Sequence, residues 1–116
     1  MAFMNGELLI NKLFSEKNTC GILVFLHVFG PKTRTEIYQA ISTNPRMPIK
    51  LDMMEEMGLV RTTDDGRGRK MTTLTNTGEK FAMTLCSLEK LLGGNVDSFK
   101  WGIMMTKLEE FDAAEA

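Results

Sequence analysis

The sequence predicts a mainly α-helical domain that carries one small β-hairpin. Two observations support this fold class. The first is an apolar segment over residues 20–29, which suits a buried helix and is stopped by Gly30-Pro31. The second is the segment 58–81, GLVRTTDDGRGRKMTTLTNTGEKF. In this segment a β-branched strand, an Asp-Gly turn, a second strand and a helix start follow one another.

The composition fits one soluble globular domain whose charge is unevenly distributed. At 116 residues the chain can enclose a single hydrophobic core. Its formal net charge of −1 gives no general sign of nucleic-acid binding. Residues 31–50, however, contain four cations and one carboxylate, whereas residues 81–116 contain three cations and six carboxylates. Contact with a polyanion is therefore expected in the middle of the chain.

No segment predicts export or membrane insertion. The longest apolar run, Ile22 to Leu26, is far shorter than a membrane span, and no secretory signal pattern is visible. The two cysteines, Cys20 and Cys86, stand far apart in apolar contexts, which favours reduced thiols. We therefore expect a cytoplasmic protein that does not contact membranes.

Apolar spacing and capping signals predict further helices in the first half of the chain. Residues 7–14 form a short amphipathic helix ahead of the apolar one. Thr33 and Glu36 form a capping box that opens a short helix to about residue 41. After a turn, another helix runs over about 46–57. Its expected core-facing stripe consists of Met47, Leu51 and Met54.

The second half is predicted to contain the hairpin and two helices. The strands span residues 59–63 and 71–74 and are joined through the Asp-Gly turn. Asn76 is the expected cap of a helix whose apolar seam follows at helical spacing. That seam consists of Phe81, Leu85, Leu88 and Leu92. Gly93-Gly94 then ends this helix, and a last helix runs to about residue 111.

The last helix carries more apolar surface than one small domain can cover. Phe99 and Ile103 are expected nearly opposite a broad face of large apolar side chains. A second subunit would cover the excess, so we predict a homodimer. The predicted dimerisation residues are Phe99, Trp101, Ile103, Met105, Leu108 and Phe111. The chain then divides into an N-terminal helical segment (1–17), a central domain (18–92) and a C-terminal dimerisation helix (93–116).

Three stretches of the chain resemble the winged helix-turn-helix transcription regulators of prokaryotes, most of all the MarR and HxlR groups. Residues 22–37 resemble the IL..L..GP.RF.EL run of HxlR proteins. Residues 54–60, MEEMGLV, match the LEE.GLV that ends recognition helices in both groups, and residues 74–78, LTNTG, match the LT..G after the wing. The similarity covers about residues 18–92 and rests on the ordered combination of motifs. It implies a winged helix-turn-helix that regulates transcription by binding double-stranded DNA.

The expected DNA contacts come from two elements of this fold. The recognition helix, about 46–57, would enter the major groove, and the wing, 61–74, would lie on the backbone or in the minor groove. Base contacts are expected from Arg46, Ile49, Lys50 and Met53, with Lys50 equally suited to a phosphate. Phosphate or minor-groove contacts are expected from Thr33, Arg34, Thr35, Arg67, Arg69 and Lys70. Asp64 and Asp65 would either repel phosphate or orient a neighbouring arginine.

Two other functions fit the sequence, and an enzyme does not. A winged helix can bind a protein partner instead of DNA. Cys20 and Cys86 would suit a thiol-based redox sensor, because Cys20 lies in the first turn of a helix, whose dipole favours thiolate. No nucleophile–histidine set, phosphate-binding glycine loop or metal-ligand cluster predicts catalysis, so we expect no cofactor and no metal site. A small-molecule effector is left open.

Overall fold

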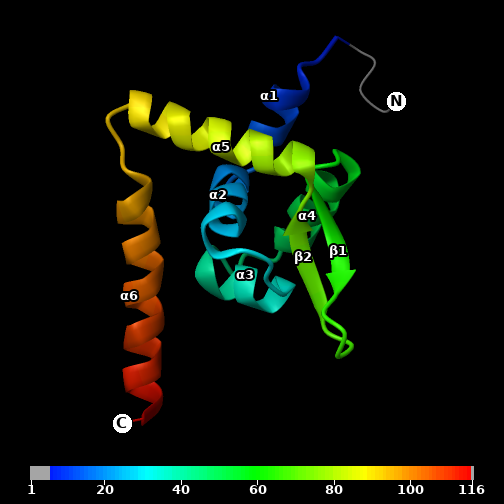
Figure 1. Ribbon diagram of the computed structural model, residues 1–116. Helices are drawn as coiled ribbons and strands as arrows, with labels where there is room; N and C mark the ends of the chain where they lie inside the picture. The colour runs from blue at the N-terminus through cyan, green and yellow to red at the C-terminus, as the bar shows by residue number, and fades with distance from the viewer. Residues whose placement is uncertain (1–5, 116) are drawn as a thin grey trace.

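The computed structural model describes residues 6–115, with side chains described up to Thr106. Over this range the predicted fold class is confirmed, with helices throughout and one antiparallel hairpin (Figure 1). The elements follow in the order α1 (Leu9–Phe14), α2 (Thr19–Phe29), α3 (Arg34–Ala40), α4 (Met47–Glu56), β1 (Val60–Asp64), β2 (Lys70–Leu74), α5 (Asn76–Leu91) and α6 (Val96–Glu115). No helix in the described part of the chain is both long and apolar enough to span a membrane.

Helix α2 lies at the centre of the hydrophobic core. Ile22, Leu23 and Phe25 are completely buried, as expected for a helix that is apolar nearly all round. Each such side chain contributes roughly 1.5–3 kcal/mol through burial. The other buried members of the core are Leu13, Leu26, Ile37, Met47, Leu51, Met54, Leu59, Val60, Ala82 and Ile103. Every element except β2 therefore supplies at least one buried core residue.

The helix-turn-helix is formed by α3 and α4. The predicted capping box is present: the Glu36 amide donates to Thr33 Oγ1 at 3.1 Å, and the Thr33 amide donates to Glu36 Oε1 at 3.1 Å. Helix α4 starts one residue after Arg46, whose amide donates to Asn44 Oδ1 at 2.8 Å. Its predicted stripe is confirmed, because Met47, Leu51 and Met54 are completely buried.

The hairpin is attached to the chain segment that precedes α3. Strands β1 and β2 pair in the register Val60↔Leu74 through Asp64↔Lys70. A further bridge joins Lys32 to Thr72, in which the Thr72 amide donates to the Lys32 carbonyl at 2.7 Å and the Lys32 amide donates back at 3.2 Å. Thr72 is buried at this junction. The hairpin is therefore fixed to the helix-turn-helix by main-chain bonds.

Helix α5 is capped one residue earlier than predicted, and Asn76 is not its cap. Thr75 Oγ1 accepts a hydrogen bond from the Gly78 amide at 3.0 Å and also donates to the Gly58 carbonyl. The threonine is favoured here because its hydroxyl satisfies the helix start and the end of the preceding loop together. Gly78 is equally constrained, since a Cβ there would collide with the backbone carbonyl of Leu59. Helix α5 then crosses above α2, and α6 leads away from its end (Figure 1).

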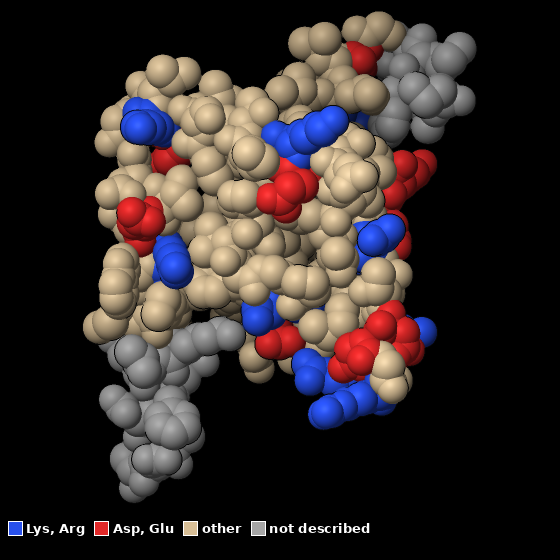
Figure 2. Space-filling model, viewed as in Figure 1, with Lys and Arg blue, Asp and Glu red and all other residues tan. Residues whose placement is uncertain are grey.

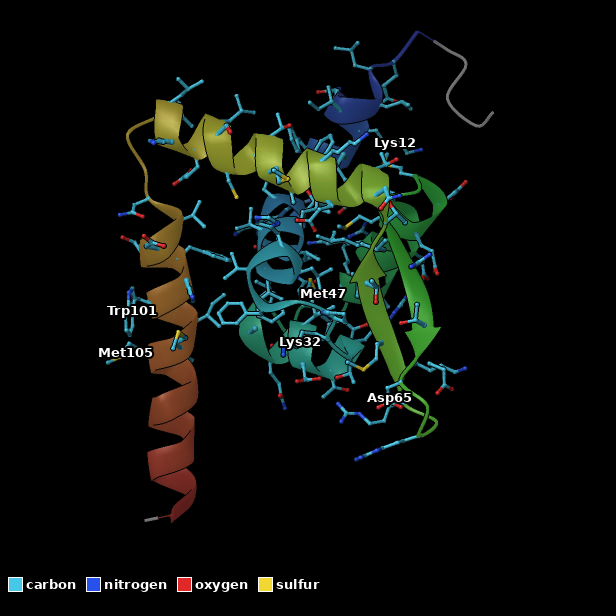
Figure 3. The ribbon with its side chains drawn as sticks, in the orientation of Figure 1. Lys12, Lys32, Met47, Asp65, Trp101 and Met105 are labelled. Carbon is cyan, nitrogen blue, oxygen red and sulfur yellow. The ribbon has the colours of Figure 1, made fainter. Side chains whose placement is uncertain are left out.

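Helix α6 has two different apolar sides, which corrects part of the predicted dimer interface. Ile103 is buried in the core of its own domain and Phe99 packs partly against that core, so Ile103 is not available to a second subunit. Trp101 and Met105 point away from the domain and are 59% and 52% exposed (Figure 3). Leu108 and Phe111 lie outside the described side chains.

Candidate nucleic-acid interface

A groove lined by threonines and cations lies between the start of α3 and the hairpin. It has a volume of about 320 Å³ and is lined by Thr33, Arg34, Thr35, Thr62, Arg69, Lys70 and Thr72. The structure therefore brings together two groups of predicted phosphate contacts that are far apart in the sequence. The main-chain bridge between Lys32 and Thr72 holds the two walls of the groove in place.

Asp64 and Asp65 bind backbone amides of the wing loop, which is the turn between β1 and β2 (residues 65–69). Asp64 Oδ1 accepts hydrogen bonds from the amides of Gly66 at 2.8 Å and Gly68 at 3.3 Å. Asp65 Oδ1 accepts from the amides of Arg67 at 2.8 Å and Arg69 at 3.1 Å. Such aspartate-to-amide bonds are the usual way in which short polar side chains stabilise turns. One oxygen of each carboxylate therefore binds the loop, and the other lies within 4 Å of a cation, at Arg69 or Lys70.

The cations of the hairpin tip differ in how far they are neutralised. Arg69 lies 3.4 Å from Glu36 and 3.6 Å from Asp65, and Lys70 lies 3.9 Å from Asp64. Among the described residues Arg67 enters no ion pair, and it is exposed. Figure 2 shows the acids of the hairpin tip directly beside its cations, at the lower right. The tip is thus a cluster of mixed charge rather than a purely basic patch.

Arg34 links the two helices of the helix-turn-helix. Its guanidinium donates to Asp52 Oδ1 on α4 at 2.7 Å. Partial burial lowers the pKa of Arg34, but hydrogen bonds and charge interactions with Asp52 and Tyr38 outweigh it, so the pKa rises. Arg34 remains a cation that lines the groove, and it is the less exposed partner of the pair, with 33% of its side chain exposed against 67% for Asp52.

The structure corrects the predicted role of Lys50. This side chain is only 3% exposed, and its ammonium donates to the Lys17 carbonyl at 2.8 Å. Lys50 lies one helical turn after the buried Met47, which places it at the edge of the core-facing stripe. The connection between α1 and α2 covers it there. Lys50 therefore cannot reach a DNA groove from this position.

The remaining predicted readers are Arg46, which caps the start of α4, and Ile49 and Met53 on α4. Ile49 is 55% exposed, whereas Met53 is partly buried against the core. Arg46 is exposed, and its Nη2 donates to Glu16 Oε1 at 2.6 Å. No sequence pattern marks Glu16 or Lys17 as partners of α4, because they are thirty and thirty-three positions away from the cations they contact.

Both thiols have a raised pKa, although Cys20 is exposed. Partial burial raises the pKa of Cys20, and the opposing backbone hydrogen bond is the smaller effect. Burial and the charge of Glu79 raise the pKa of Cys86. A raised thiol pKa lowers the fraction of reactive thiolate at neutral pH. The pKa of Cys20 therefore lies above its usual value, although the residue stands in the first turn of α2.

The described residues contain no cluster of three or more histidine, cysteine or acidic side chains that could hold a metal ion. His27, the one histidine of the chain, pairs through Nδ1 with Glu79 Oε1, which joins α2 to α5. This contact accounts for the histidine as a structural residue.

Solved structures share this arrangement of helices and hairpin. The chain is similar to MepR, a transcription regulator of the Staphylococcus aureus multidrug efflux pump MepA, with a TM-score of 0.58 and 20% identity over 90% of this chain and 79% of the other. It is also similar to reduced AbfR bound to DNA, with a TM-score of 0.51 and 18% identity over 86% of this chain and 76% of the other. No family model and no curated protein sequence matches the chain. The structural likeness confirms that the chain has the winged helix-turn-helix fold of such regulators.

Proposed function

We propose that this protein is a transcription regulator that binds double-stranded DNA. The observation that carries the proposal is the groove between α3 and the hairpin, where threonine hydroxyls and the cations Arg34, Arg69 and Lys70 meet on one surface. Helix α4 would enter the major groove, and the wing, 61–74, would follow the backbone or the minor groove. The fold shared with a transcription regulator and with a protein solved on DNA supports this assignment.

The ion pairs of the candidate interface are compatible with phosphate binding. Exposed pairs such as Arg69 with Glu36 contribute only about 0–1 kcal/mol, so a phosphate competes readily with the carboxylate. Arg67 has no carboxylate to give up among the described residues, and it lies at the hairpin tip. The expected phosphate contacts are thus Thr35, Arg67, Arg69 and Lys70, and the expected base contacts are Arg46 and Ile49.

The proposed regulator acts as a homodimer through the outer face of α6. Trp101 and Met105 are exposed there, and Leu91 and Leu92 at the end of α5 are 82% and 85% exposed. Exposed apolar side chains mark an interface where they form one patch, and we propose that these do. Two copies would place two recognition helices in successive major grooves. Trp101→Ala combined with Met105→Ala should yield monomers in sedimentation, and an unchanged dimer would exclude this face.

The test of DNA binding is the salt dependence of affinity for duplex DNA. When binding releases counterions, the logarithm of the affinity falls linearly with the logarithm of the salt concentration. Replacing Arg67, Arg69 and Lys70 by alanine should weaken binding and reduce the slope by roughly one for each phosphate that is no longer neutralised. The matched control replaces Lys80, Lys90 and Lys100, which are exposed on α5 and α6, by alanine.

Two results would reject the proposal. One is the absence of detectable affinity for duplex DNA at low salt. The other is an equal effect of the wing variant and the control variant, since that would reflect net charge alone. Either result would favour the rival assignment, in which the hairpin and α4 bind a protein partner.

A further inference from the structure

We propose that Glu16 is a positioning residue that orients Arg46 for the recognition of a guanine base. This inference rests on the proposed DNA-binding function and adds a specificity determinant to it. Glu16 belongs to the connection between α1 and α2, and Arg46 immediately precedes α4. Arg46 would be the side chain of the recognition helix that selects sequence, and Glu16 would fix its direction without touching DNA.

Glu16 could either hold Arg46 in the direction of the DNA or mask its charge. The relative exposure of the two side chains favours the first role. Glu16 Oε1 accepts from Arg46 Nη2 at 2.6 Å, and the arginine side chain is 56% exposed against 24% for the glutamate. The arginine is therefore the more accessible partner of this pair. The pair of Arg34 with Asp52 has the opposite order, because there the acid is the more exposed partner. Only Nη2 of Arg46 meets Glu16 in this pair, and this leaves the other guanidinium donors for a ligand.

Both partners are attached to rigid parts of the domain. The Thr19 hydroxyl, which is buried, lies within hydrogen-bond distance of the Leu13 carbonyl at 3.1 Å and the Glu16 carbonyl at 3.2 Å. The buried ammonium of Lys50 binds the next carbonyl, that of Lys17, at 2.8 Å. On the other side, the Arg46 amide is fixed by Asn44. A guanidinium held in this way loses little further freedom when it binds.

Guanine is the base that best matches the guanidinium donors of Arg46 that do not contact Glu16. Its O6 and N7 acceptors in the major groove match the parallel donors of arginine, and this is the commonest base-specific contact to DNA. Within α4 itself the one cation is Lys50, which is buried. Arg46 is therefore the cation at this helix whose orientation can determine the preferred base. The neighbouring Ile49 offers only apolar contact.

The experiment measures base preference with the whole chain. A library of random double-stranded DNA is selected on the wild type, and duplexes with single base changes in the enriched sequence are then titrated. The wild type should prefer guanine at one position of each half-site by about tenfold or more. Glu16→Gln should remove most of this preference, because a neutral amide oxygen holds a guanidinium more weakly than a carboxylate does. It should change affinity for an unrelated duplex by less than about twofold, since every phosphate contact remains. Glu56→Gln, on the exposed end of α4, is the charge-matched control.

Arg46→Lys provides the second arm of the experiment. Lysine keeps the charge but lacks the planar pair of donors, so the guanine preference should fall as it does in Glu16→Gln. In the Arg46→Lys background, Glu16→Gln should have no further effect on base preference. The thermal midpoint should change little in either variant, because an exposed ion pair contributes only slightly to stability.

The outcomes separate this inference from the proposed function. If Glu16→Gln tightens binding to all sequences alike, Glu16 masks Arg46 and the inference is overturned. An unchanged guanine preference in Glu16→Gln overturns it as well, while DNA binding that is weakened by the wing variant would leave the proposed function intact. Absence of binding to any duplex at low salt would overturn both.

Discussion

The wing loop and helix α4, the proposed recognition helix, are held by different kinds of contact. The loop is organised by its own residues, since Asp64 and Asp65 bind amides no more than four positions away. Helix α4 is held by residues thirty or more positions away, at Arg46 and Lys50, and by its buried stripe. The shape of the loop is therefore a local property, whereas the presentation of α4 depends on the folded core.

The largest expected loss of stability follows from shortening a side chain in the buried stripe of α4. Leu51→Ala should lower the free energy of unfolding by roughly 2–5 kcal/mol, because Leu51 is completely buried and its removal leaves a cavity. Chemical denaturation followed by circular dichroism measures this loss. Ile49→Ala, on the exposed side of the same helix, should change stability by less than about 0.5 kcal/mol. Equal losses in the two variants would contradict the assignment of these faces.

A smaller loss of stability is expected when Lys50 is replaced. Lys50→Met keeps the length of the side chain but leaves the Lys17 carbonyl without its donor, which should cost about 1 kcal/mol of stability. The salt slope of DNA binding should not change, because the ammonium is buried and meets no phosphate. A slope reduced by roughly one would show instead that Lys50 reaches the DNA backbone. Lys90→Met serves as the exposed control for stability.

The smallest effect on global stability is expected in the wing loop. Asp65→Ala removes the acceptor of two loop amides, so hydrogen exchange of Arg67 and Arg69 should accelerate. The free energy of global unfolding should change by less than about 0.5 kcal/mol, since the loop is exposed. Asp65→Asn keeps a side-chain oxygen that can accept the same bonds and should behave like the wild type. Loss of global stability in Asp65→Ala would show that the loop is not a local unit.

The same distinction explains which parts of the fold could be predicted from the sequence. The capping box of Thr33 and Glu36 spans four residues, so its geometry is set by local spacing, and the prediction is confirmed. The stripe of α4 follows from helical periodicity alone. The predicted α5 cap is wrong by one residue, because Thr75 is favoured over Asn76 by a contact to Gly58, which lies seventeen positions earlier.

The candidate site could be predicted less completely, for a physical reason. Helical periodicity places Lys50 beside Arg46, but only the folded chain shows that the connection between α1 and α2 covers Lys50 and supplies Glu16 to Arg46. The same limit applies to Ile103, which periodicity places away from Trp101. Whether that side meets its own domain or a second subunit depends on the path of the whole chain.

The main-chain bridge between Lys32 and Thr72 also restricts how the length of this chain can vary. An inserted residue between Gly30 and Thr33 would change which residue pairs with Thr72, because the bridge allows one register only, and it would shift the start of α3 relative to the hairpin. Insertions at the tip of the hairpin, beyond the last strand pair of Asp64 and Lys70, would leave that pairing intact. Functional variants with altered loop lengths are thus expected to cluster at the tip, with the stretch before α3 constant in length.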